Sequence, residues 1–138
     1  MRNRETEYQL FEVINVKPLI VKFSVKDENI TLMFYLIPNL VRIEKDQVVS
    51  VVSSAIFSVF SDKPRFDDMC DPRKFINKTP IIPEITTIDE GGTEIRVNDK
   101  KIIKIKAKIT NINVYSDLRD NLGNPCVNVS WIQSINVE

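Results

Sequence analysis

The sequence predicts an all-β protein, an antiparallel β-sandwich or barrel of about seven or eight strands. Ile and Val fill 34 of the 138 positions, whereas Ala fills two, and β-branched residues favour the pleated surface of a sheet over a helix. Apolar and polar residues alternate with a period of two along much of the chain, as in half-buried strands. We expect a single β domain, residues 1–138, because a chain of this length suits one hydrophobic core.

The first strands form a hairpin. Alternating residues predict a strand over 8–16 that closes before Pro18, then a strand over 19–25. The polar turn 26–29 joins it to a return strand over 30–37. In this return strand both parities are largely apolar, which predicts a central strand covered on both faces.

Pro38 ends that strand or marks a bulge, and residues 40–43 continue the ladder. After a polar turn, residues 48–60 fit two patterns, because their apolar positions match both a strand and a helical stripe. Their many β-branched side chains favour the strand.

Residues 61–92 differ from the rest and predict an irregular, proline-rich connector within the domain. Four prolines fall close together, at Pro64, Pro72, Pro80 and Pro83. Residues 67–77 can hold a short helix interrupted at Pro72, and residues 84–88 a short edge strand. Long irregular segments are uncommon in compact domains, so we interpret this one either as an interaction loop or as a linker packed over the core.

Three further elements complete the prediction. A strand over 93–97 leads through the turn 98–99 into a long strand over 100–115. Its apolar parity shifts beyond Thr110, which is what a β-bulge does. A loop over 116–124 precedes the last strand. That strand points inward the residues Val127, Val129, Trp131, Ile135 and Val137, and outward Asn128, Ser130, Ser134 and Asn136.

The two ends of the chain resemble each other in arrangement. Setting residues 25–27 against 97–99 aligns Ile37 with Ile109 and Asn39 with Asn111. Five identities over 25–42 are within what shared strand composition yields. A true duplication would give two similar three-stranded meanders.

Charge and targeting signals exclude some classes of protein. Nineteen basic and nineteen acidic residues cancel, so no global field attracts nucleic acid or an anionic membrane. The N-terminus is charged and no apolar run is long enough to span a bilayer. We therefore expect no membrane partner and a cytoplasmic protein or a virion component. Few alanines beside many Ile, Lys and Asn residues suit an AT-rich genome, such as an archaeal or viral one.

Cys70 and Cys126 leave two interpretations open, a pair of buried thiols or one disulfide that closes a long loop. The chain contains no histidine, so two distant cysteines do not supply the ligands of a zinc site. We expect no metal, no cofactor and no small-molecule substrate.

A row of lysines is the strongest candidate for a binding site. Lys104, Lys106 and Lys108 share the polar face of the strand over 100–115, and Lys100 and Lys101 precede them. Phosphate groups of nucleic acid are the obvious anionic partner. The competing interpretation is protection of a solvent-facing strand against aggregation, because no aromatic residue alternates with the lysines to stack on bases.

Carboxylates mark two further segments without predicting a site. Asp67, Asp68 and Asp71 can hold a divalent ion if they converge, but they also suit the start of a helix. Asp117 and Asp120 suit a turn. Without histidine, general base catalysis would need a carboxylate or lysine with a shifted pKa, and no sequence feature marks one.

The sequence therefore favours a non-enzymatic structural or assembly protein. We expect it to associate with itself or with another protein through sheet edges and the 61–92 connector. The alternative function is a nucleic-acid-binding β-barrel module that uses the lysine row.

Overall fold

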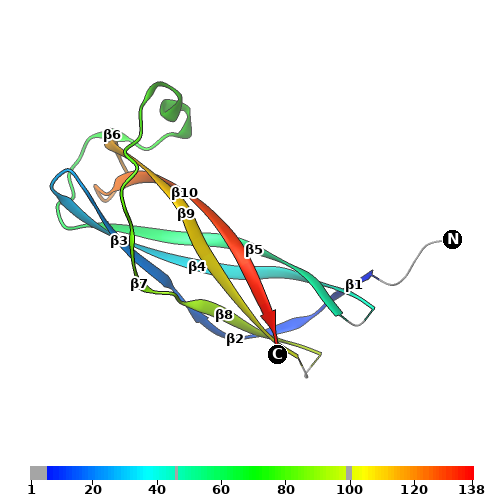
Figure 1. Cartoon of the computed structure of the whole chain (residues 1–138). Helices are drawn as coiled ribbons and strands as arrows, with labels where there is room; N and C mark the ends of the chain where they lie inside the picture. Colours follow the sequence, from blue (N-terminus) through cyan, green and yellow to red (C-terminus); the bar gives the residue numbers. More distant parts are fainter. Residues whose placement is uncertain (1–5, 46, 99–100) are drawn as a thin grey trace.

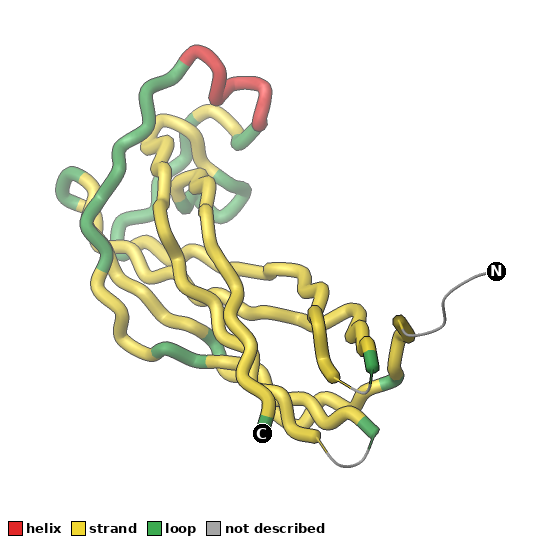
Figure 2. Tube along the Cα trace, turned by 45° about the vertical axis from the view of Figure 1, so that its right-hand side comes forward, coloured by secondary structure: helices red, strands yellow, loops and turns green. Residues whose placement is uncertain are grey.

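The computed structural model describes residues 6–45, 47–98 and 101–138. Strands make up 72% of the described residues and helix 5%, in two antiparallel sheets that pack together. The predicted all-β sandwich is therefore confirmed. Figures 1 and 2 show the two sheets facing each other, with the first described strand (Thr6–Gln9) and the helical turn at opposite ends of the molecule.

The first sheet, sheet A, is built on a meander of β3 (Leu19–Val25), β4 (Glu28–Glu44) and β5 (Gln47–Ser61). The short strand β1 (Thr6–Gln9) pairs with the far end of β4, and β7 (Thr86–Asp89) pairs with β3. Because β4 has β5 on one side and both β3 and β1 on the other, it is the central strand that the sequence predicts.

The second sheet, sheet B, is built on a second meander of β8 (Gly92–Val97), β9 (Lys101–Arg119) and β10 (Pro125–Val137). β2 (Phe11–Lys17) pairs with β8, and the two-residue strand β6 (Asp68–Met69) runs parallel to the end of β9. The two expected meanders are thus present, one in each sheet.

The sheets meet at a corner formed by Pro18 and Gly91. β2 lies in sheet B and β3 in sheet A, while their partners β8 and β7 cross in the opposite order (Figure 1). Gly91 has a φ of 61°, and a Cβ on it would lie 2.3 Å from the carbonyl oxygen of Pro18. Only glycine fits this close approach of two backbones.

The core lies between the sheets and follows the predicted parities. Alternate residues of β3 and β4 are buried, as are those of β8 and β9. The largest apolar side chains with almost no exposure are Phe34, Ile30, Leu32, Ile95, Ile103, Ile105, Ile112 and Leu118. On β10 the predicted inward residues pair with inward residues of β9, for example Trp131 with Ile109.

Both meanders carry a bulge near the middle of their long strand. Between β9 and β10 the register skips Thr110, where the sequence predicts a bulge. Between β4 and β5 it skips Asn39, next to Pro38. Pro38 therefore marks a bulge and does not end the strand.

Three boundaries differ from the sequence-based expectation. The predicted first strand divides into β1 and β2 at Leu10, and the connector adds β6, which raises the strand count to ten. The predicted loop over 116–124 is wrong for residues 116–119, which extend β9. The polar residues in this segment suggest a loop, but Leu118 and Arg119 are fully buried. Tertiary contacts therefore override the preference of these residues for a loop.

The connector contains the expected short helical segment, a 3₁₀ turn η1 (Pro72–Asn77) that begins at Pro72. Residues 48–60 are strand, not helix.

The outer residues of β4 were expected to be covered, but no second layer lies over them among the described residues. Met33, Tyr35 and Ile37 are only partly buried.

Candidate association surface

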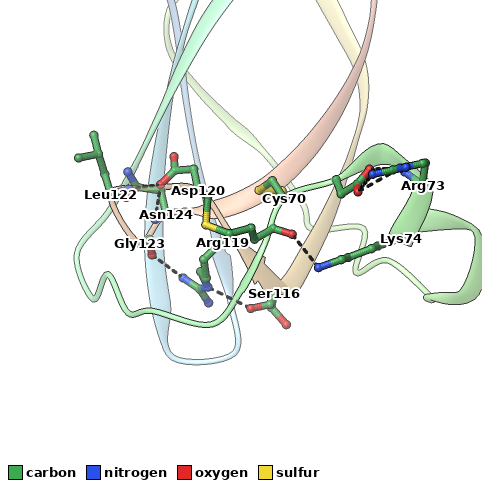
Figure 3. The surroundings of a disulfide bond; sticks show 12 residues. Cys70, Arg73, Lys74, Ser116, Arg119, Asp120, Leu122, Gly123 and Asn124 are labelled. Atoms are coloured by element: carbon green, nitrogen blue, oxygen red, sulfur yellow. Dashed lines mark hydrogen bonds and ion pairs between the residues drawn. A yellow bond between two sulfur atoms is a disulfide. The ribbon is translucent and has the colours of Figure 1, made fainter.

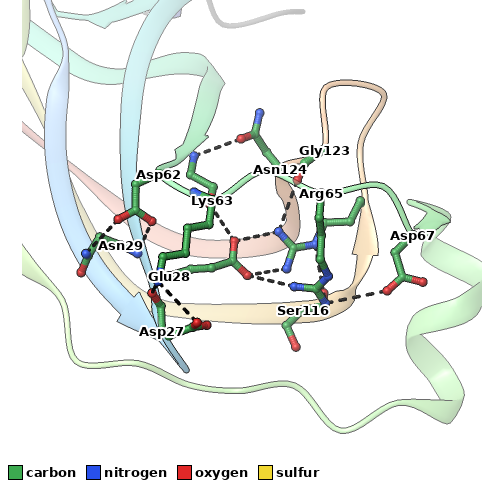
Figure 4. Close-up of polar contacts among 12 residues, drawn as sticks. Asp27, Glu28, Asn29, Asp62, Lys63, Arg65, Asp67, Ser116, Gly123 and Asn124 are labelled. Atoms are coloured by element: carbon green, nitrogen blue, oxygen red, sulfur yellow. Dashed lines mark hydrogen bonds and ion pairs between the residues drawn. The ribbon is translucent and has the colours of Figure 1, made fainter.

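A buried ion pair closes one end of the sandwich. Glu28, at the start of β4, has a side chain 5% exposed, and that of Arg119, at the end of β9, is 0% exposed. The guanidinium donates to both carboxylate oxygens, with Nη1 2.8 Å from Oε2. Ser61 and Arg65 also donate to this carboxylate, at 2.6 and 3.2 Å (Figure 4).

Backbone carbonyls also accept hydrogen bonds from these two guanidinium groups. Arg119 Nε donates to the carbonyl of Ser116 at 3.0 Å, and Arg65 Nη2 to the same oxygen at 2.8 Å. The hydrogen bond from Arg119 lowers the pKa of Glu28 to about 2. Burial alone would raise this pKa, but the hydrogen bond from Ser61 and the charges of Arg119 and Arg65 also lower it. A carboxylate with this pKa is a poor general base near neutral pH. The charge-assisted hydrogen bonds of the cluster instead join the two meanders to the connector.

A disulfide holds the connector on sheet B. Cys70 and Cys126 are bonded, with Cα atoms 5.9 Å apart. The backbone N–H of Cys70 donates to the carbonyl of Arg119 at 2.9 Å, and Figure 3 shows Arg119 close to the disulfide. Of the two interpretations that the sequence left open, the structure contains the disulfide. Phe75 stacks on Tyr115 at 4.1 Å, which fixes η1 against the same end of β9.

The lysine row lies on the outer face of sheet B, and acidic partners pair with part of it. Lys104 contacts Glu138 at 3.0 Å, and this hydrogen bond raises the pKa of Lys104. Lys106 contacts Glu90 at 3.1 Å. Lys108 is exposed, Lys101 is partly buried, and Lys100 lies outside the described residues.

The aromatic residues that could stack on bases lie elsewhere. Trp131 is on the inner face of β10, where its ring meets Phe34 edge to face at 5.5 Å. Tyr115 is 8% exposed and is stacked on Phe75. Neither Trp131 nor Tyr115 therefore provides an aromatic platform beside the described lysines of the row.

The acidic segments form caps and turns. Asp71 is the N-cap of η1 and accepts from the backbone N–H of Arg73 at 3.0 Å. Asp120 accepts from the N–H groups of Leu122 and Asn124, both at 2.9 Å. Within residues 6–45, 47–98 and 101–138, no three acidic or cysteine side chains converge in a way that could hold a metal ion.

The feature that sequence patterning missed is the edge of each sheet. β5 pairs with β4 alone and β10 with β9 alone among the described strands, so each has a free backbone edge. β5 has 15 residues and β10 has 13, and neither contains a charged residue, although 28% of the chain is charged. Every other described strand carries at least one charge. Long uncharged edges lack the usual protection against pairing with another chain.

β5 also presents apolar side chains on the outer face of sheet A. Val52, Ile56 and Phe60 are 51%, 57% and 51% exposed. They pair across the ladder with Leu40, Tyr35 and Thr31 of β4, so they share a face with the uncovered outer residues of β4. The exposed Ser54 and Ser58 lie between them on the same face of β5. Exposed apolar side chains of this size are frequent at interaction sites.

The free edges of β5 and β10 face each other along a line that we call the seam. Near its middle, Gln133 Nε2 of β10 donates to the carbonyl of Val51 of β5 at 2.8 Å. Towards the disulfide the strands diverge and leave the seam groove, of about 410 Å³. Its apolar walls include Phe57, Val59, Phe60, Leu122, Pro125 and Val127.

The seam is an incompletely closed part of the core. Phe57 stacks parallel to the buried ring of Phe34 at 6.5 Å, yet it is 39% exposed. Ser53 Oγ and Gln133 Oε1 are the buried side-chain atoms without a hydrogen-bond partner in the described part of the chain, and both belong to the seam strands. Such atoms are rare in completed cores.

The chain matches no family model, no curated protein and no solved structure. None of the described helical residues forms a segment long and apolar enough to cross a bilayer.

The sequence contains one signal for the association surface, because the absence of charge from 47–61 and from 125–137 is visible there. What the sequence did not show is that both of these long strands lie at an edge of their sheet.

Proposed function

We propose that this chain is a non-enzymatic structural or assembly protein that acts by associating with copies of itself. The observation that carries the proposal is the pair of long, uncharged edge strands, β5 and β10. An exposed strand edge with apolar neighbours is a template for another chain, and natural monomers block it with charge, proline or a covering segment.

Self-association is favoured over binding of a charged partner. The surface around the edge of β5 carries Val52, Ile56 and Phe60 and no charged side chain of its own strand. An uncharged apolar surface gains most from meeting another surface of the same kind. The lysine row, where Lys104 and Lys106 are already paired with acidic residues, offers a weaker electrostatic site.

The test compares two matched charge insertions. Ile56→Lys places a charge on β5 at a side chain that is 57% exposed, and Ile88→Lys does the same on β7 at 55% exposure. We expect the wild-type chain to self-associate in multi-angle light scattering over a concentration series. Ile56→Lys should shift it to monomer, and Ile88→Lys should leave its mass distribution unchanged.

Both substitutions replace exposed side chains, so circular dichroism should show unchanged folding for each. A wild-type chain that remains monomeric up to its solubility limit would refute the proposal. Equal loss of association in both variants would show that added charge acts generally and not through β5.

A further inference from the structure

Part of β9 lacks a neighbouring strand on the side opposite β10. β8 pairs with β9 only as far as Ile105, and the connector meets β9 again at Val114, through two backbone hydrogen bonds with Ile81. Between these points, over residues 106–113, no described strand pairs with this edge. The chain instead crosses to sheet A, where β7 pairs with β3 before β8 returns to β9 (Figure 1).

A cavity of about 530 Å³, which we call the slot, follows this unpaired edge. All four residues 106–109 of β9 line it. Successive side chains of a strand point to opposite faces, so a cavity lined by four consecutive residues runs along the edge of that strand. The opposite wall of the slot consists of Leu19, Val21, Ile85 and Thr87.

The slot is open on the side of β7. β7 is the last strand of sheet A on this side, so its second edge is also unpaired among the described strands. All four of its residues are exposed, including Thr87, although Thr87 pairs with the buried Val21. Unpaired strand edges that border an apolar cavity form the arrangement that binds an added peptide strand. Backbone hydrogen bonds hold such a strand, and alternate side chains enter the cavity.

The charges around the slot favour an acidic segment. Glu90, directly after β7, contacts Lys106 at 3.1 Å, so a carboxylate on the β7 side reaches the lysines of β9. Lys108 also lines the slot, is exposed and contacts no acidic side chain among the described residues. The outward side chains of a strand added to β9 would lie beside these lysines, where opposite charges across a ladder stabilise pairing.

We propose that the slot binds an extended peptide segment of another protein, in which acidic and apolar residues alternate. The segment pairs with the edge of β9 at residues 106–109. Its apolar side chains enter the slot against Val21, Ile85 and Ile109, and a carboxylate meets Lys108. This site goes beyond the proposed self-association, because β5 lies at the opposite side of sheet A. It gives the lysine row a binding role that needs no aromatic platform.

The probe is a fluorescein-labelled synthetic peptide that alternates glutamate and valine, titrated in fluorescence anisotropy. We expect saturable binding by the wild type and also by Ile56→Lys, because the slot does not involve β5. Two further versions of the peptide carry N-methyl groups on the amides of the valines or of the glutamates. Alternate amides of a strand point to opposite sides, so the version whose blocked amides face β9 should bind at least about tenfold more weakly.

Two matched variants test the charge. Lys108→Glu should weaken binding at least about tenfold, whereas Lys26→Glu should bind as the wild type does. Lys26 is an exposed lysine in the turn between β3 and β4 and does not line the slot. Both substitutions replace exposed side chains, so circular dichroism should show unchanged folding. Hydrogen exchange measured by NMR should slow for amides of residues 106–109 when the peptide is bound.

Several results would overturn this inference. They are the absence of saturable binding up to about 1 mM peptide, equal affinity of both N-methylated peptides and the parent, and equal weakening in the two lysine variants. Protection of β5 amides in place of those at 106–109 would show that the peptide adds to the uncharged edge, and would overturn it too. A monomeric wild type that binds the peptide in the slot would refute the proposed self-association alone.

Discussion

Replacing Glu28 with Gln is expected to destabilise the fold by about 3–5 kcal/mol, the usual cost of breaking a buried ion pair by removing one partner. Glu28 and Arg119 are 5% and 0% exposed, and the guanidinium contacts both carboxylate oxygens. The substitution leaves Arg119 buried without a counter-charge.

The pKa of Glu28 gives an independent magnitude. Folding lowers this pKa from 4.5 to about 2, and each pKa unit corresponds to about 1.4 kcal/mol, which gives about 3 kcal/mol. An acid whose pKa is lowered by folding stabilises the native state above its unfolded pKa. That stability is lost as the pH falls from about 4.5 towards 2.

The assay is urea unfolding at neutral pH and at a series of acidic pH values. The wild type should lose stability steeply below pH 4.5, whereas Glu28→Gln should start low and show a smaller decline over the same interval. Asp27→Asn is the matched control, because Asp27 is 83% exposed and its pairing with Lys63 at 3.4 Å is a surface contact. We expect that variant to stay within about 0.5 kcal/mol of the wild type.

A double variant separates lost attraction from an unpaired charge. Replacing Glu28 and Arg119 together by Leu removes both charges, so it should cost less than Glu28→Gln alone. An unfolding midpoint of Glu28→Gln equal to that of the wild type at neutral pH would refute this account. So would an unchanged acid dependence.

Three further outcomes are expected. Cys70→Ser should lower the free energy of unfolding by about 2–4 kcal/mol, because the disulfide to Cys126 closes a loop between cysteines 56 residues apart. Dithiothreitol should cause the same loss of stability in the wild type and have no effect on the variant. Gly91→Ala should cost at least about 1–3 kcal/mol, since the added Cβ would clash with Pro18 at a φ of 61°; a thermal midpoint unchanged from the wild type would contradict it. Ser53→Ala should stabilise the fold by up to about 1 kcal/mol, because it removes a buried hydroxyl without a partner; clear destabilisation in urea would argue that the hydroxyl is hydrogen-bonded in solution.

The faces of the strands could be predicted from the sequence because burial follows the period of two. The inward set on β10 and the bulge at Thr110 are examples, since both depend on parity alone. Residues 116–119 were misassigned because their burial comes from the connector and the loop that close around Arg119. Contacts between segments so far apart leave no local pattern.

The disulfide and the expected cytoplasmic location favour different environments. Disulfides persist mainly in oxidising compartments, whereas the cytoplasm keeps most thiols reduced. Cys70 is partly buried and Cys126 is 7% exposed. Thiol labelling of the protein from its native source, without reductant, distinguishes the two, because a bonded pair takes up label only after reduction.

The edges of the sheets could not be predicted in the same way, because an edge is a property of topology. The sequence shows that 47–61 and 125–137 lack charge, but an uncharged strand in the middle of a sheet needs no protection. Only when the two meanders are placed side by side do β5 and β10 become the outer strands, with their free edges facing each other. Charge on either edge would protect a monomer, and its absence from both, in a chain that places charge on every other described strand, is the observation on which the proposed self-association rests.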